Sequence, residues 1–103
     1  MIKVSALYPN IEGTQFDMAY YCNVHMPMVK EKLGTALIRI EIDRGVASSV
    51  TGAPANYCAA GHLYFETMEK FLAAFTPHAQ VIRGDVPNFT NIVPTVQISE
   101  VML

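Results

Sequence analysis

The side chain best suited to chemistry in this sequence is His25, within residues 16–27. Their pattern is typical of an amphipathic helix, and at 100° per residue His25 falls on the apolar face. The residues within about 60° of it are Met18, Tyr21, Cys22, Met28 and Val29. An unpaired buried polar group costs free energy, so this imidazole needs a partner or a cavity. Because imidazole is well matched to proton transfer near neutral pH, His25 is our candidate general acid/base.

Two further side chains extend this candidate site. Tyr21 lies one turn before His25 on the same face, where its hydroxyl can orient a substrate carbonyl or the imidazole. His78 follows Pro77 as His25 precedes Pro27, and a proline opens space by breaking the helical hydrogen-bond ladder. If the two helices are neighbours, both imidazoles reach one cavity, with His78 as an auxiliary donor.

A purely structural role remains open for both histidines. His25 can instead bond a backbone carbonyl. His78 lies near a helix C-terminus, where a positive charge is favoured.

Aromatic side chains and one acid are candidates for substrate binding. The predicted set is Tyr8, Tyr64, Phe65, Phe89 and Asp43, and Tyr57 also belongs to this aromatic group. Asp43 ends a predicted strand and can point into a cleft, or it can pair with Arg44 in solvent. Aromatic residues in so small a domain also serve simply as core.

The remaining histidine and the cysteines give no functional signal. His62 is expected in the core or at an interface, and Cys22 and Cys58 are expected as reduced core residues, because they lack C-x-x-C spacing. The three histidines match no metal-ligand spacing, and no carboxylate cluster accompanies them. We therefore expect neither a metal nor a cofactor.

The elements that must position these residues follow from hydrophobic periodicity. Strands are predicted over 2–8, 37–46, 57–65 and 92–101, and helices over 14–33 and 67–84. Thr14 and Asp17 resemble a capping box, and Gly34 suits a helix end. The order βαββαβ predicts one α+β domain over residues 1–103. Its ferredoxin-like fold has two helices on one face of a four-stranded antiparallel sheet.

Composition bears on partners. Hydrophobic residues make up 51% of the chain and charged residues only 16%, which is more apolar material than a small monomer buries well. We expect a homodimer through the open sheet face, forming a dimeric α/β barrel, although an unusually apolar monomer is the alternative. The net charge of −2 and the scattered basic residues argue against nucleic-acid binding. No segment predicts a membrane span or secretory leader, so a cytoplasmic protein is expected.

Four pieces of the sequence carry a family resemblance. They are Phe16-Asp17-Met18-x-Tyr20-Tyr21-x-Asn23-x-His25-Met26-Pro27, Gly61-His62-Leu63-Tyr64-Phe65, the opening residues 1–10 and the tail residues 87–94. Together they resemble the EthD family, named for the ethyl tert-butyl ether degradation system. The resemblance implies a dimeric α/β barrel of ferredoxin-like subunits, and it matches His25 to the histidine of the family's His-Met-Pro piece.

The resemblance constrains activity less than fold. The ether-degradation members are thought to assist a monooxygenase system, whereas the wider superfamily includes isomerases, cyclases and cofactor-free monooxygenases. Our leading hypothesis is a cofactor-free acid/base enzyme acting on a small hydrophobic oxygenated metabolite. The alternatives are a non-catalytic ligand-binding or accessory protein and a purely structural dimer.

Overall fold

Alternating apolar residues place four segments in one antiparallel sheet, and longer periodic segments form the helices that cover it. The structure is a computed structural model that describes residues 1–103. Its strands are β1 (Ile2–Pro9), β2 (Arg39–Arg44), β3 (Tyr57–Phe65) and β4 (Thr95–Glu100). Its α-helices are α1 (Met18–Tyr20), α2 (Met26–Leu33), α3 (Met68–Phe75) and α4 (Ala79–Gly84). This order confirms the predicted α+β ferredoxin-like arrangement.

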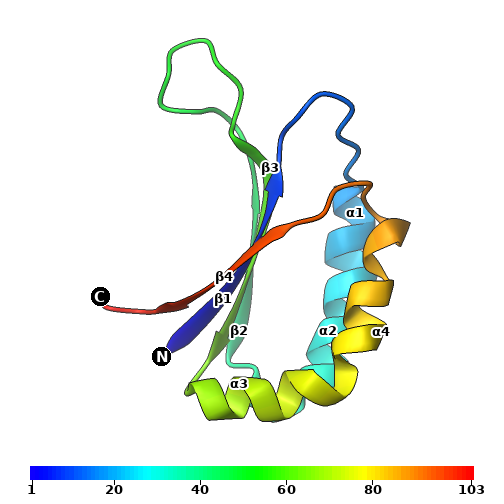
Figure 1. Cartoon of the computed structure of the whole chain (residues 1–103), viewed down its shortest axis with the longest axis vertical. Coiled ribbons are helices and arrows are strands. Elements are labelled where there is room, and N and C mark those ends of the chain that lie inside the picture. The colour runs from blue at the N-terminus through cyan, green and yellow to red at the C-terminus, as the bar shows by residue number, and fades with distance from the viewer.

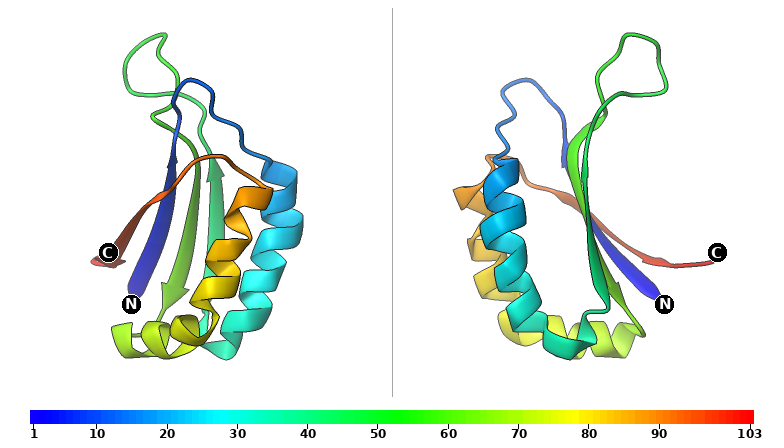
Figure 2. Two further views of the ribbon diagram at one scale, coloured as in Figure 1. Left: turned by 45° about the vertical axis from the view of Figure 1, so that its right-hand side comes forward. Right: turned by 180° about the vertical axis from the view of Figure 1, so that it is seen from behind.

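The sheet has the strand order β2-β3-β1-β4, so the first and third strands lie at its centre. Val4 pairs with Leu63 on one side and with Ile98 on the other, which directs all three side chains to the same face. The helices pack on that face, and nothing within the chain covers the other (Figures 1 and 2). The sheet is therefore open and does not close into a barrel by itself.

The first helical segment changes its hydrogen bonding in the middle. Asp17 caps α1 by accepting from the Tyr20 amide, and the π turn Tyr21–His25 follows, in which the Met26 amide donates to the Tyr21 carbonyl. Pro27 has no N–H with which to donate to the preceding turn. The turn directly before it is closed by the Met26 amide, which donates to a carbonyl five residues back. The predicted disturbance at Pro27 is therefore a π turn, and Gly34, with φ of 61°, ends α2 as expected.

Two local predictions for this segment were wrong. The helix begins at Met18 rather than at Thr14, because the Thr14 hydroxyl bonds backbone groups of Ile11 and closes a separate turn. Cys22 is exposed rather than in the core. Each residue of a π turn advances by less than the 100° of an α-helix, which moves Cys22 off the apolar stripe.

The second helical segment is also divided at a proline. Thr67 caps α3 by accepting from the Lys70 amide, and a 3₁₀ turn at Thr76–His78, which contains Pro77, separates α3 from α4. Figure 1 shows that α3 and α4 run in different directions. The last strand starts at Thr95 instead of Ile92, because Pro94 cannot donate to a ladder. No helix here is both long and apolar enough to span a membrane.

Candidate functional site

A largely apolar cavity lies between the helical layer and the sheet. Its volume is about 470 Å³, and 15 of its 20 lining residues are hydrophobic. Tyr8, Tyr21 and His25 line it, and each is at most 4% exposed. A volume of this size suits a small molecule, and a few polar groups among apolar walls are typical of a ligand site.

His25 is held in the cavity wall by a carboxylate from the other end of the chain. Its Nδ1 lies 2.8 Å from Oδ2 of Asp85, and the His25 and Asp85 side chains are 4% and 17% exposed. An ionised carboxylate only accepts hydrogen bonds, so Nδ1 carries the proton. Nε2 of His25 makes no hydrogen bond and is not fully buried, which leaves it free for a ligand.

Asp85 is itself fixed by two more donors. The Tyr20 hydroxyl donates to its Oδ1 over 2.8 Å, and the Asn88 amide donates to the same oxygen over 2.9 Å. Partial burial works against ionisation, but the hydrogen bonds from Asn88, His25 and Tyr20 outweigh it and lower the pKa of Asp85. The carboxylate therefore stays charged and orients the imidazole.

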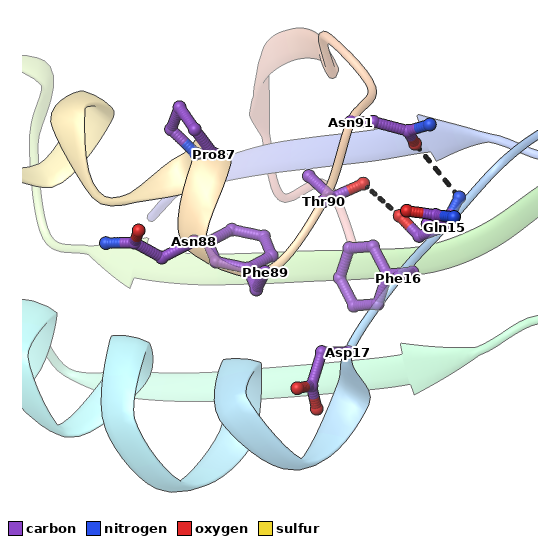
Figure 3. A pocket seen from close by; sticks show the side chains of 8 residues that line it. All are labelled: Gln15, Phe16, Asp17, Pro87, Asn88, Phe89, Thr90 and Asn91. Carbon is purple, nitrogen blue, oxygen red and sulfur yellow. Dashed lines mark hydrogen bonds between the residues drawn. The ribbon is translucent and has the colours of Figure 1, made fainter.

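The segment that carries Asp85 is tied to the start of α1. The Asp17 amide donates to the Phe89 carbonyl over 2.8 Å, and the Thr90 hydroxyl donates to the Gln15 carbonyl over 2.6 Å. Figure 3 shows these residues around a shallow depression of about 410 Å³. Phe89 also packs on His25, with ring centroids 4.7 Å apart. The segment 85–90 thus holds both the His25 ring and its carboxylate partner.

Tyr21 contributes a hydroxyl that is buried without a partner. Its oxygen makes no hydrogen bond, and its ring is stacked on that of His25 with centroids 5.6 Å apart. Gly61 provides the space, because a Cβ at that position would overlap the Tyr21 hydroxyl. An orphaned buried hydroxyl lowers stability, and no other group of the chain satisfies this one.

The two phenols of the cavity are both neutral donors. Burial raises the pKa of Tyr8 to about 12 and raises the pKa of Tyr21 above its ordinary value. The phenol groups are close enough to influence each other's pKa, but their geometry does not form a hydrogen bond. Tyr21 is therefore suited to donating a hydrogen bond to an oxygen, not to removing a proton.

Two predicted binding residues lie on the opposite face of the sheet. The Tyr64 hydroxyl donates to Glu41 over 2.6 Å, and the guanidinium of Arg39 covers the Tyr64 ring at 4.2 Å. Asp43 Oδ2 lies 3.1 Å from Nε2 of His62. Strand alternation explains both placements, since neither position shares a face with Tyr8 or Gly61.

The other predicted site residues are near the cavity without lining it. Phe65 packs against Phe71 in the core, and Phe89, in the segment that follows α4, packs on the His25 ring. His78 is partly buried in the 3₁₀ turn before α4, where its neighbours Thr76 and Ala79 line the cavity but His78 does not. The structure therefore brings together Tyr8, Tyr21 and His25, and it leaves His78 apart.

Asp85 is the functional residue that sequence reasoning missed. It directly follows the second predicted helix, which ends at residue 84, and 60 positions separate it from His25. The available signal was chemical: a histidine on an apolar face needs a buried partner, and acids at helix ends are candidates. No three His, Cys, Asp or Glu side chains converge closely enough to hold a metal ion.

Comparisons with known proteins agree with this architecture. The family model described as EthD domain matches residues 12–92. An EthD-like protein from Ralstonia eutropha is 45% identical in sequence and superposes with a TM-score of 0.94, over 99% of this chain and 92% of that one. No match was found among the curated proteins.

Two more distant structures share the fold. An ethyl tert-butyl ether degradation family protein from Bacillus halodurans is 23% identical, with a TM-score of 0.76 over 99% of both chains. HapK from Hahella chejuensis is 16% identical, with a TM-score of 0.57 over 99% of this chain and 93% of that one.

Removing the orphaned hydroxyl should not destabilise the protein. We expect Tyr21→Phe to leave the free energy of unfolding unchanged or to raise it by up to about 1 kcal/mol, because no hydrogen bond is lost. Tyr20→Phe is the matched control and should lower the free energy of unfolding, because that hydroxyl donates to Asp85. Urea denaturation measures both. A clear loss of stability in Tyr21→Phe would show that the hydroxyl has a structural partner.

The lowered pKa of Asp85 predicts a pH dependence of stability. Ionised Asp85 stabilises the fold above its unfolded pKa of about 3.9, and this contribution is lost as the pH falls through the lower folded pKa. The difference in unfolding free energy between the wild type and Asp85→Asn should therefore shrink from about pH 5 to about pH 2.5. The exposed Asp43→Asn provides the control, measured by urea denaturation across this range. An equal pH dependence in both variants would contradict the assignment.

Proposed function

This chain belongs to the EthD family, and we propose that it is a cofactor-independent acid/base enzyme for a small hydrophobic oxygenated metabolite. One observation carries the proposal: a histidine with a free Nε2 stands beside an unpartnered tyrosine hydroxyl in an apolar cavity. A base, an oxygen-directed donor and dry walls are what proton transfer next to a carbonyl requires.

The chemistry assigns a separate task to each group. Asp85 holds the proton on Nδ1 of His25, so Nε2 can take a proton from a carbon next to the substrate carbonyl. Negative charge then develops on the carbonyl oxygen, where the hydrogen bond from Tyr21 strengthens. Return of the proton from His25 to another carbon completes an isomerisation. Alternatively, the carbanion attacks a second carbonyl carbon of the same molecule, the C=O π bond opens to an alkoxide, and His25 returns its proton to that oxygen, which completes a cyclisation.

Deuterium exchange tests this proposal without knowledge of the natural substrate. The protein is incubated in D₂O with 2-octanone and cyclohexanone, and NMR follows the exchange of the protons next to the carbonyl. We expect acceleration by the wild type, a reduction of about 10²–10⁴-fold in His25→Gln, and a reduction of about 10²-fold in Tyr21→Phe.

The control is His78→Gln, which removes a histidine that does not line the cavity. It should leave the exchange rate unchanged. If the wild type binds the ketones without accelerating exchange, acid/base catalysis is overturned and a non-catalytic binding protein takes its place. If His78→Gln abolishes exchange and His25→Gln does not, the base has been misassigned.

We also propose that the chain is a homodimer through the open sheet face. The chain exposes 6577 Å², whereas a monomer of 11.4 kDa typically exposes roughly 5,800 Å². The excess of roughly 800 Å² resembles the area that one partner contributes to a standard interface. On the open face, Lys3 and Arg39 balance Glu41 and Asp43, so a twofold-related copy is a complementary partner.

Light scattering coupled to gel filtration tests the dimer. Leu7 belongs to the open face, so Leu7→Arg should shift the protein toward the monomer, because the partner sheet would have to bury an unpaired charge. Val24→Arg, at a 49% exposed position on the helical layer, should leave the dimer intact. A monomeric wild type would overturn the proposal, and disruption by Val24→Arg alone would move the interface to the helices.

A further inference from the structure

The cavity is closed at one end and open at the other. Tyr21 and His25 at the inner end are 1% and 4% exposed, whereas Leu72, Val96 and Ile98 are 48%, 59% and 42% exposed. These exposed lining residues belong to α3 and β4 (Figure 1). The mouth of the cavity therefore lies between these two elements, and a ligand that reaches His25 extends from there.

Arg83 on α4 is the one permanently charged side chain that lines the cavity. It is exposed, so it belongs to the outer part of the lining, and no acidic residue lines the cavity with it. Its guanidinium carbon lies 5.5 Å from the centroid of Phe75, another lining residue, which holds the cation at the wall. Arg83 takes part in none of the ion pairs of the chain. The cation is therefore available to an anionic group.

We propose that the ligand is a small amphipathic carboxylate, with its carboxylate at Arg83, an apolar body along the walls and an oxygen at Tyr21. This inference rests on the proposed function, because it uses the same cavity and the same inner oxygen. The two polar anchors are of different kinds. Tyr21 offers one neutral donor in a buried, apolar setting, which suits a carbonyl oxygen, whereas Arg83 offers a planar cation beside solvent.

A carboxylate fits this arrangement better than a phosphate. A guanidinium binds a carboxylate in a planar, two-bonded geometry. No second lysine or arginine lines the cavity to neutralise a dianion. The apolar lining between the two anchors favours a hydrocarbon body, and the volume of about 470 Å³ limits the ligand to a small molecule.

A matched pair of ligands tests the inference. 7-Oxooctanoate and 2-octanone have the same carbon chain and the same ketone, and they differ only in the terminal carboxylate. Isothermal titration calorimetry on the full chain should give about tenfold tighter binding of 7-oxooctanoate by the wild type. Arg83→Gln should bind both ligands equally, with its affinity for 2-octanone unchanged. Arg44→Gln, which removes an arginine outside the cavity, should keep the tenfold preference.

The outcomes separate this inference from the proposed function. Equal binding of the two ligands by the wild type, or a preference that survives in Arg83→Gln, overturns the carboxylate site. Ketone exchange that depends on His25 can still be observed in that case, and the proposed function then stands alone. A preference that depends on Arg83 without any proton exchange supports the carboxylate site and overturns catalysis. Failure of both ligands to bind the wild type overturns both proposals.

Discussion

The structure of the site depends on one hydrogen bond in a largely apolar setting, between His25 and the carboxylate of Asp85. The pair joins the first helical segment to the segment that follows α4, and these are the two parts of the chain that enclose the cavity. Three donors converge on the carboxylate, which offsets the cost of removing it partly from water. With Asp85 satisfied in this way, the imidazole has one defined orientation and one free nitrogen.

The architecture was largely predictable from the sequence because it follows from local periodicity. The alternation of β1 and β2 and the glycine at the end of α2 identify the elements and their order. The π turn was not predictable in the same way. Pro27 predicts a break in the helical hydrogen bonding. Whether the helix kinks, ends or widens there depends on which side chains must reach the core.

The site was predictable only where its members are close in sequence. Tyr21 and His25 are four residues apart, so helical geometry alone places them side by side. Asp85 and Gly61 join them through the folded chain, and no periodicity records that contact. Tyr64 and Asp43 were predicted to bind the substrate, but they lie on the face of the sheet away from the cavity. An aromatic or acidic residue on a strand is a plausible ligand contact on either face, and only the register decides which face it takes.

The contact between Gly61 and Tyr21 ties two distant positions into one unit. A side chain at Gly61 is incompatible with the present position of the Tyr21 phenol, because the hydroxyl occupies the volume that a methyl group would need. A phenylalanine at position 21 would have no oxygen at this point, and the overlap with a Cβ at position 61 would be smaller. Any side chain at position 61 therefore requires either the loss of the Tyr21 oxygen or a displacement of the phenol away from the strand, and both change the donor that the cavity offers.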